Sequence, residues 1–299
     1  MTYSIVARDP ETGELGVAVQ SAYFTVGPVV PWVEAGVGAI ATQSLVNVAF
    51  GPAGLALLRS GFSAQQALDA LIAGDSDPDG RQLAIVDAAG GVAVHTGPGA
   101  IGAAGHHFGA GYSCQANLME RDTVWDAMAD AFEGSASEPL PLRLIAALRA
   151  AEAEGGDIRG RQSAAMVVTR GNPTGRPWDD RTVDLRVDDH PDPVEELARL
   201  LRIRLAYNAA LGGGRVLSTE AADDDVLRAR QEALKIAPEM TQLRFMAGIS
   251  YALAGDWDQG LELIRGVLQE EPRFLEALRR MEAAGRMPAG IAEQVKARL

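Results

Sequence analysis

Short apolar segments separated by turn residues open the chain. Residues 3–8 (YSIVAR) and 15–20 (LGVAVQ) are apolar and rich in β-branched side chains, and residues 9–13 supply Asp, Pro and Gly for a turn between them. This pattern predicts a β-hairpin. Residues 29–33 and 37–42 are rich in small apolar side chains, as is typical of strands buried on both faces of a sheet. The first region is therefore expected to be built from strands.

Helical periodicity replaces this pattern over residues 52–74. Ser63 and Gln66 form a capping box, which marks the start of a second helix within this stretch. Further helices are predicted over residues 123–132, residues 139–156, and from Asp192 onward. Further strands are predicted over residues 82–87, 92–95, 111–117, 163–169 and 182–187.

The order of these elements is strands, two helices, strands, two helices, strands and one helix. Strand blocks separated by helix pairs favour two sheets packed face to face with the helices outside, over a parallel βαβ series. The predicted class is therefore α+β, with one large domain over residues 1–208.

The composition changes after three glycines at residues 212–214 to Ala, Leu, Glu and Arg, the mix that is typical of stacked helices. Glycines in a row are typical of a flexible connection. We therefore expect a glycine-rich linker over residues 209–215 and a small all-α domain over residues 216–299.

The all-α region carries a repeat signature. Pro238 and Pro272 stand 34 residues apart, with Gly248, Tyr251 and Gly260 between them. This spacing resembles the tetratricopeptide repeat. A lone helix pair buries its apolar face only against a neighbour, so it is expected to form a groove for a protein partner or, alternatively, a dimerisation or capping element. Homo-oligomerisation is a further expectation, since a second copy of the chain could bury the apolar face that a lone repeat leaves exposed.

Charge and composition narrow the function classes. The net charge of −13 has the wrong sign for sequence-independent binding to nucleic acid or to an anionic membrane. No run of about 18 apolar residues and no secretory signal is present, so the expected location is the cytoplasm. With one cysteine and four histidines, neither a disulfide nor a metal site is expected, and no cofactor is implied. Small-molecule substrates and protein partners remain.

Threonine at position 2 carries the first candidate chemistry. A side chain this small usually permits removal of the initiator Met1, which leaves the Thr2 hydroxyl and a free α-amine on one residue. An α-amine with a pKa near 8 can take the hydroxyl proton at neutral pH and activate the oxygen as a nucleophile.

Several segments in one order place this threonine in a known context. They are residues 2–9 (TYSIVARD), 41–43 (ATQ), 81–82 (RQ), 86–90 (VDAAG), 95–97 (HTG), 160–165 (GRQSAA) and 184–191 (DLRVDDHP). Together they resemble the family called domain of unknown function 1028 over about residues 1–205. That family is classed with the N-terminal-nucleophile (Ntn) hydrolases, so the resemblance implies a four-layer αββα sandwich.

A more distant similarity is to proteasome-type β subunits, in which an N-terminal threonine opens the first strand. Here a helix ending at residues 155–156 runs into Asp157 and then Arg161, Gln162 and Ser163, and the similarity implies that these residues lie near the N-terminus. Those subunits tune the threonine with a lysine, whereas the first lysine of this chain is Lys235. Arg8 or Arg161 could supply positive charge, but arginine cannot act as a base. Proteasome-like peptidase activity is therefore not expected.

Acyl transfer also needs donors for an oxyanion, and the end of the strand near Gln43 offers backbone N–H groups. The alternative is that Gln43 and Asn47 only cap the following helix. His95 is expected either to orient substrate or to bond a loop carbonyl. The residues assigned to catalysis are Thr2, Gln43, Asp157 and Ser163. The residues assigned to substrate binding are Arg8, Ser21, Asn47, His95, Asn117, Arg161 and Gln162.

The other side chains that could carry chemistry are not expected to belong to a functional site. His106 and His107 would point to opposite sides of a strand, which argues against a shared metal ion. Cys114 is expected to be a small core residue. Asp188 and Asp189 are expected in a solvated turn or in a salt bridge to Arg186.

The favoured hypothesis is an Ntn amidohydrolase acting on a small amide, ureido or γ-glutamyl-like compound, with Thr2 as nucleophile and its α-amine as base. The alternative is a catalytically silent Ntn-like module that binds a small molecule or serves assembly, with the repeat as adaptor. Retention of Met1 would favour the alternative, because the α-amine would then belong to the wrong residue.

Overall fold

The computed structural model describes residues 2–211 and 224–299 of the chain. It divides into two compact units, of which the first ends at Leu201 and the second begins at Arg202. The first unit contains all the strands of the described residues, and the second is helical. No helix in the described ranges is both long and apolar enough to span a bilayer.

The larger sheet of the first unit has six antiparallel strands, with the N-terminal strand near its middle. In spatial order they are β10 (Arg181–Val187), β9 (Ser163–Thr169), β2 (Leu15–Ser21), β1 (Thr2–Arg8), β8 (Tyr112–Asn117) and β7 (Gly105–Gly109). Strand β1 pairs with β2 and β8 on either side. Its backbone is therefore hydrogen-bonded on both edges, which leaves little freedom to its first residue.

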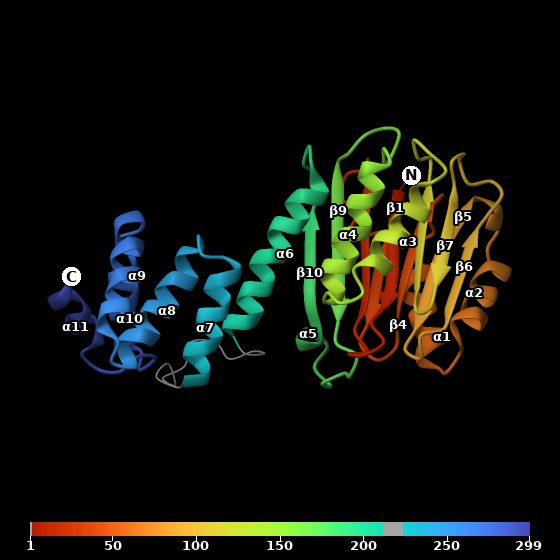
Figure 1. Ribbon diagram of the computed structural model, residues 1–299. Coiled ribbons are helices and arrows are strands. Elements are labelled where there is room, and N and C mark those ends of the chain that lie inside the picture. Colours follow the sequence, from red (N-terminus) through yellow and green to blue (C-terminus); the bar gives the residue numbers. More distant parts are fainter. Residues whose placement is uncertain (1, 212–223) are drawn as a thin grey trace. The chain divides into compact units, whose positions relative to one another are not determined.

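The smaller sheet has four strands and faces the larger one. Its order is β3 (Pro31–Glu34), β4 (Gly38–Ser44), β5 (Arg81–Asp87) and β6 (Val92–Thr96). Helices α1 (Phe50–Arg59) and α2 (Ala64–Ala73) pack on its outer face, and α3 (Val124–Gly134) and α4 (Leu140–Ala153) pack on the outer face of the larger sheet. The result is the predicted α–β–β–α order of layers (Figure 1).

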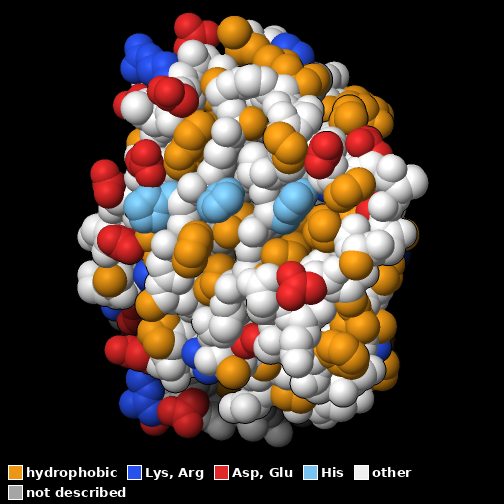
Figure 2. Space-filling view, turned by 90° about the vertical axis from the view of Figure 1, so that its right-hand side faces the viewer, with side chains coloured by type: hydrophobic (Ala, Val, Ile, Leu, Met, Phe, Trp, Pro, Cys, Tyr) orange, Lys and Arg blue, Asp and Glu red, His pale blue; other side chains and the backbone are white. Residues whose placement is uncertain are grey.

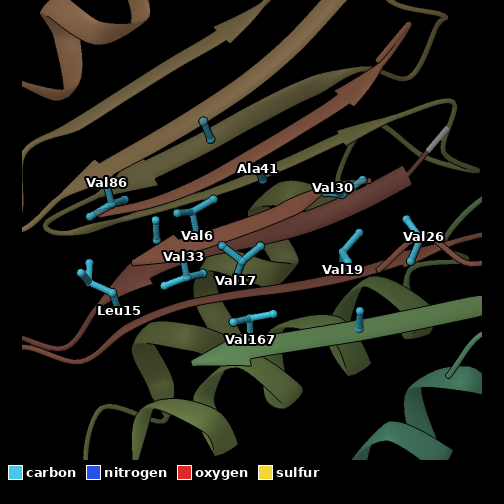
Figure 3. Packing of buried hydrophobic residues seen from close by; sticks show 13 residues of the cluster. Val6, Leu15, Val17, Val19, Val26, Val30, Val33, Ala41, Val86 and Val167 are labelled. Carbon is cyan, nitrogen blue, oxygen red and sulfur yellow. The ribbon is translucent and has the colours of Figure 1, made fainter. Parts of the chain in front are cut away.

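The space between the sheets changes character along the strands. Valines such as Val6, Val17, Val86 and Val167 fill one part of it with an apolar cluster (Figure 3). Strand side chains alternate between faces, so Ser4 lies on the same face of β1 as Val6, nearer the start of the strand. Toward that end the inward positions are polar and buried. They include Thr2, Ser4, Gln43, Gln82, Gln115 and Asn117.

Some elements depart from the hydrophobic pattern. Strand β7 has the sequence GHHFG, whose side chains are partly or fully exposed, and an edge strand of this kind lacks the alternation that would predict it. The short helix α5 (Pro177–Asp180) is likewise not predicted, and α1 begins two residues earlier than expected. Val29 and Val30, predicted as strand, lie in a turn where both N–H groups bond to the Val26 carbonyl.

The second unit is helical, as predicted. It comprises the end of α6 (Pro193–Ala210) with α7 (Asp224–Ile236), α8 (Thr241–Leu253), α9 (Trp257–Glu270), α10 (Phe274–Ala283) and α11 (Ile291–Arg298). The predicted linker over residues 209–215 overlaps the end of α6 at residues 209–210, and residues 212–215 lie outside the described residues.

Two glycines set the spacing of α8 and α9. A Cβ added to Gly260 would lie 2.8 Å from the Gly248 carbonyl oxygen and 2.9 Å from the Ala252 nitrogen. Such contacts with backbone atoms cannot be relieved by a side-chain rotation, so the two helices must carry glycine at their crossing. The tetratricopeptide character of this pair stays a prediction.

This crossing generates a stability prediction. Gly260→Ala should destabilise the helical unit by about 1–3 kcal/mol, because the added methyl group overpacks the α8–α9 contact. Gly266→Ala in the same helix is the matched control. The nearest atom to its added Cβ is a flexible arginine nitrogen at 3.7 Å, so it should stabilise the helix by roughly 0.5–1 kcal/mol. Urea unfolding followed by circular dichroism measures both, and equal effects would contradict the crossing geometry.

Candidate active site

The Thr2 side chain lies at the end of the sandwich where the inward positions are polar. Its Oγ1 donates to Ser21 Oγ at 3.1 Å. Its backbone carbonyl accepts from Gln43 Nε2 and from Asn117 Nδ2, each at 3.3 Å. Only 5% of Thr2 is exposed to solvent. The threonine is therefore buried among polar partners from both sheets.

Asp157 and Ser163 reach the same end of the sheet from the segment that follows α4. Ser163 lies opposite Ser21 in the β2–β9 ladder. The Asp157 Oδ2 accepts from the Ala22 N–H at 3.2 Å, and Arg159 binds the carboxylate at 2.8 Å. The other three residues assigned to catalysis are thus connected to Thr2, Gln43 directly and Ser163 and Asp157 through Ser21 and Ala22.

The Ser163 hydroxyl holds a loop. It donates to the Tyr23 carbonyl at 2.6 Å and accepts from the Val26 N–H at 3.0 Å. Thr25 in the same loop has a positive φ of 59°, a strained conformation for a β-branched residue. Ser163 therefore fixes the chain that leaves β2 beside Thr2.

A network of side-chain amides underlies Thr2. Gln43 accepts from the Ser4 hydroxyl at 2.7 Å and donates to Gln82 Oε1 at 2.7 Å. Gln115 donates to Ser4 at 2.6 Å, and Asn117 donates to Gln82 at 2.8 Å. Two of these bonds, Ser4 to Gln43 and Asn117 to Gln82, join the two sheets, and all four satisfy polar groups whose burial would otherwise be costly.

One acceptor of this network is unused. Asn117 lies opposite Thr2 in the β1–β8 ladder, and its Oδ1 is buried without a hydrogen-bond partner among the described residues. A buried amide oxygen without a donor is unusual, and it marks a place where a further donor could be accommodated.

Arg161 lies on the other face of the larger sheet. It forms an ion pair with Glu152 of α4, which also accepts a hydrogen bond from the Tyr3 hydroxyl. Tyr3 alternates with Thr2 along β1 and points toward the helices. Burial, together with the Glu152 charge, raises the pKa of Tyr3 well above its usual value. Arg161 thus helps to hold α4 against β1, and it does not supply positive charge to the face of the larger sheet that carries Thr2.

Asn47 belongs to a cluster that holds the loop after β4. It donates to Asp75 Oδ2 at 2.9 Å, and Arg81 binds the other oxygen of that carboxylate at 2.9 Å. The Asn47 Oδ1 also accepts from the Ala49 N–H beside the start of α1. Hydrogen bonds from Arg81 and Asn47 lower the pKa of Asp75 to about 2. Asn47 thus holds the chain just before α1, although the N-cap of this helix is Ala49 and has no side-chain cap, and Gln43 bonds the amide network instead.

Three further residues assigned to substrate binding have partners other than Thr2. Arg8 ends β1, so a rise of about 3.3 Å per residue places it roughly 20 Å from Thr2, and it lines a pocket with Thr12 and Gly171 instead. His95 bonds the Pro78 carbonyl at 2.8 Å. Gln162 donates to Asp189. Neither Arg8 nor Arg161 therefore supplies to Thr2 the positive charge that a lysine supplies in proteasome-type β subunits.

Three histidines gather where β6 and β7 meet at the side of the sandwich, and Figure 2 shows histidine side chains in a row on this face. His107 pairs with Asp126 at 2.7 Å. Burial and the charges of His95 and His107 lower the pKa of His106. Within the described part of the chain, no group of His, Cys, Asp or Glu side chains is arranged to hold a metal ion. Burial also raises the pKa of the Cys114 thiol, in keeping with a core residue.

Several residues of the site escape sequence reasoning. Arg159, Glu152 and Gln115 all bond site residues. The spacing Asp157-x-Arg159 after two glycines is a signal that could have identified the first of them. Glu152 and Gln115 offer no such signal, because their partners are distant in sequence.

Exposed apolar side chains surround this end of the sandwich. They come from the loops that follow β2, β4 and β6 and from the loop that precedes β9. They are Tyr23, Phe24, Leu45, Val46, Val48, Ile101 and Ile158. Tyr23, Phe24 and Ile158 are each more than half exposed. Apolar side chains concentrated on loops around one end are typical of a binding surface.

Comparison with known proteins relates the chain to a family and to a solved structure. The model of a family described as a family of unknown function (DUF1028) matches residues 2–197. The crystal structure of protein SPO2555 from Silicibacter pomeroyi, described with the same family model, is similar with a TM-score of 0.61 and 33% sequence identity, over 72% of this chain and 88% of that chain. Among curated proteins, none matches the chain.

The cluster around Asp75 generates a pH prediction. Its pKa is lowered from the usual 3.8 to about 2 in the folded protein. The unfolded chain therefore binds the proton more readily, and the stabilisation is complete above about pH 4 and is lost as the pH falls toward 2. Asp75→Asn should lower the melting temperature at pH 7 and flatten its decline over that range.

Thermal unfolding at several pH values measures this effect. Arg81→Gln should flatten the same acid limb, because it removes the cation that lowers the pKa. Parallel curves for the wild type and Asp75→Asn would show that the cluster does not stabilise the fold.

Proposed function

The chain belongs to the family of unknown function DUF1028 over residues 2–197, and from this premise we propose that it is an Ntn amidohydrolase with Thr2 as its nucleophile. One observation carries the proposal. The hydroxyl of the first residue of a central strand points between two sheets and is hydrogen-bonded to Ser21, beside Asp157 and Asn117. A nucleophile and its orienting groups at the end of rigid strands are what acyl transfer needs.

Removal of Met1 creates the base. The Thr2 α-amine takes the hydroxyl proton as Oγ1 attacks the amide carbonyl of the substrate. The C–N bond then breaks, and the leaving amine takes a proton from the α-ammonium group. Water, deprotonated by the same amine, hydrolyses the ester that remains on Thr2. The unused Asn117 Oδ1 is the acceptor that we assign to the new α-ammonium group.

Other residues act as positioning groups in this proposal. Gln43 Nε2 already donates to three acceptors, which are the Thr2 carbonyl, Gln82 Oε1 and the Gln115 carbonyl. We therefore assign Gln43 to holding the nucleophile and not to the oxyanion. Arg159 fixes the Asp157 carboxylate, and Ser163 fixes the adjoining loop.

The oxyanion donors are assigned to the loop after β4. Ser44 turns this loop with a positive φ of 70°, and the backbone N–H groups of Val46 and Asn47 bond to no atom of the described residues. The exposed Leu45, Tyr23 and Phe24 favour a small amide that carries an apolar group.

A catalytically silent binding module is the second candidate. Two observations favour it: Thr2 is 95% buried, and the chain has no lysine before Lys235. A binding module would retain the fold and the amide network but would form no covalent bond at Thr2.

Intact mass spectrometry of untagged protein treated with a β-lactone probe separates the two candidates. We expect a mass without Met1 and one probe adduct, which Thr2→Ala should abolish. Hydrolysis of a small amide substrate should fall by about a thousandfold or more in that variant, because removing the nucleophile removes the covalent route.

Thr12→Ala is the matched control, since Thr12 lies exposed in the β1–β2 turn, and it should retain the adduct. Retained Met1 would contradict the hydrolase, because the proposed base would not exist. An adduct that survives in Thr2→Ala would place the nucleophile elsewhere.

A further inference from the structure

A pocket lies where the larger sheet extends beyond the smaller one. Strand β3 packs across β2 and β9, whereas β10 packs on β9 and on α5. The inward face of β10 is thus left without a facing strand at the edge of the sandwich (Figure 1). A pocket of about 760 Å³ lies there, and its wall includes Trp32, Val167, Thr169, Arg181 and Arg186.

The floor of this pocket contains a polar group without a partner. Thr169 is only 1% exposed, and its Oγ1 makes no hydrogen bond within the described residues. Thr169 lies two residues after Val167 on β9, so both side chains point to the same face, toward the space between the sheets. Burying a hydroxyl without a partner is costly, and a bound molecule with one polar atom would remove that cost.

Arginines supply the charge of the pocket. Arg181 bonds Asp184 at 2.7 Å, and Arg186 approaches the same carboxylate only at 3.9 Å. One carboxylate is thus shared by two guanidinium groups, and the Arg186 guanidinium forms no hydrogen bond with any described residue. Arg59 also lines the pocket but is neutralised by Glu34. Asp180 also lines the pocket, and its carboxylate accepts hydrogen bonds from Thr174. The group left available to an anion is therefore the Arg186 guanidinium.

We propose that this pocket binds a small organic carboxylate with an apolar body. The carboxylate bonds Arg186, which has donors to spare, and the planar guanidinium suits such a partner. The apolar body lies against Val167 and Trp32, and the Thr169 hydroxyl bonds a polar atom of the ligand. The site is separate from Thr2, because Thr169 is the far end of β9 from Ser163, roughly 20 Å along the strand.

Binding of phenylacetate, hexanoate and indole-3-acetate to the full chain tests this proposal, measured by isothermal titration calorimetry at millimolar ligand. We expect saturable binding of at least one acid, with 2-phenylethanol as a neutral control that binds much more weakly. Arg186→Gln should weaken binding by roughly tenfold through loss of a charge-assisted hydrogen bond. Arg279→Gln in the helical unit and Thr2→Ala should bind like the wild type.

Thr169→Val provides a second and independent variant. It keeps the shape of the side chain and removes the unpartnered hydroxyl, so the free protein should melt at the same or a higher temperature while acid binding weakens several-fold. The proposal is overturned if none of the three acids binds saturably, if Arg186→Gln binds them as the wild type does, or if Thr2→Ala abolishes binding. A lower melting temperature of free Thr169→Val would show that the hydroxyl serves the fold.

Discussion

The amide network between the two sheets is the constraint on which the rest of the first unit depends. Gln43 and Gln82 come from one sheet and Ser4, Gln115 and Asn117 from the other, and their buried side chains bond one another. An amide left without a partner there would cost far more than the bond itself contributes. The two sheets can therefore meet in one register only, and this register places the Thr2 carbonyl under two amide donors.

The valine cluster and the amide network divide the space between the sheets. The cluster supplies the non-directional part of the stability, since burial of apolar area depends little on register. The network supplies the directional part, because hydrogen bonds need a defined geometry. The same strands thus carry a stable core at one end and a polar, precisely oriented set of groups at the other. The nucleophile that we propose at the polar end would have its neighbours in place before any substrate arrives.

The unequal size of the two sheets has its own consequence. Six strands cannot be covered by four, so the sheet that carries β10 needs loops and α5 to cover its inner face. Loops pack less regularly than strands, and a pocket remains. In the second unit, the close packing of α8 and α9 depends on two glycines. Gly248 and Gly260 have no Cβ, and they let the two helix backbones approach closely.

The sequence by itself determined much of the fold. Alternating and continuous apolar segments predicted nine of the ten strands in the right order, the capping box at Ser63 is present as predicted, and the family resemblance is confirmed over residues 2–197. These features are local, or they are repeated along the chain, so one sequence suffices to read them. The edge strand β7 and the helix α5 lack such a local signal, and the pattern does not predict them.

The tertiary structure decided which of the predicted polar residues meet at Thr2 and which do not. Thr2, Ser21, Asp157 and Ser163 come together because β1, β2 and β9 are neighbours in the sheet, whereas Arg8, although close to Thr2 in sequence, lies at the other end of the same strand. The sequence likewise did not identify Glu152 as the partner of Arg161, or Asp75 as the partner of Asn47. An extended strand places residues that are near in sequence far apart in space, whereas strand pairing brings together residues that are far apart in sequence. The order of the strands therefore decides which side chains meet at the end of a sheet.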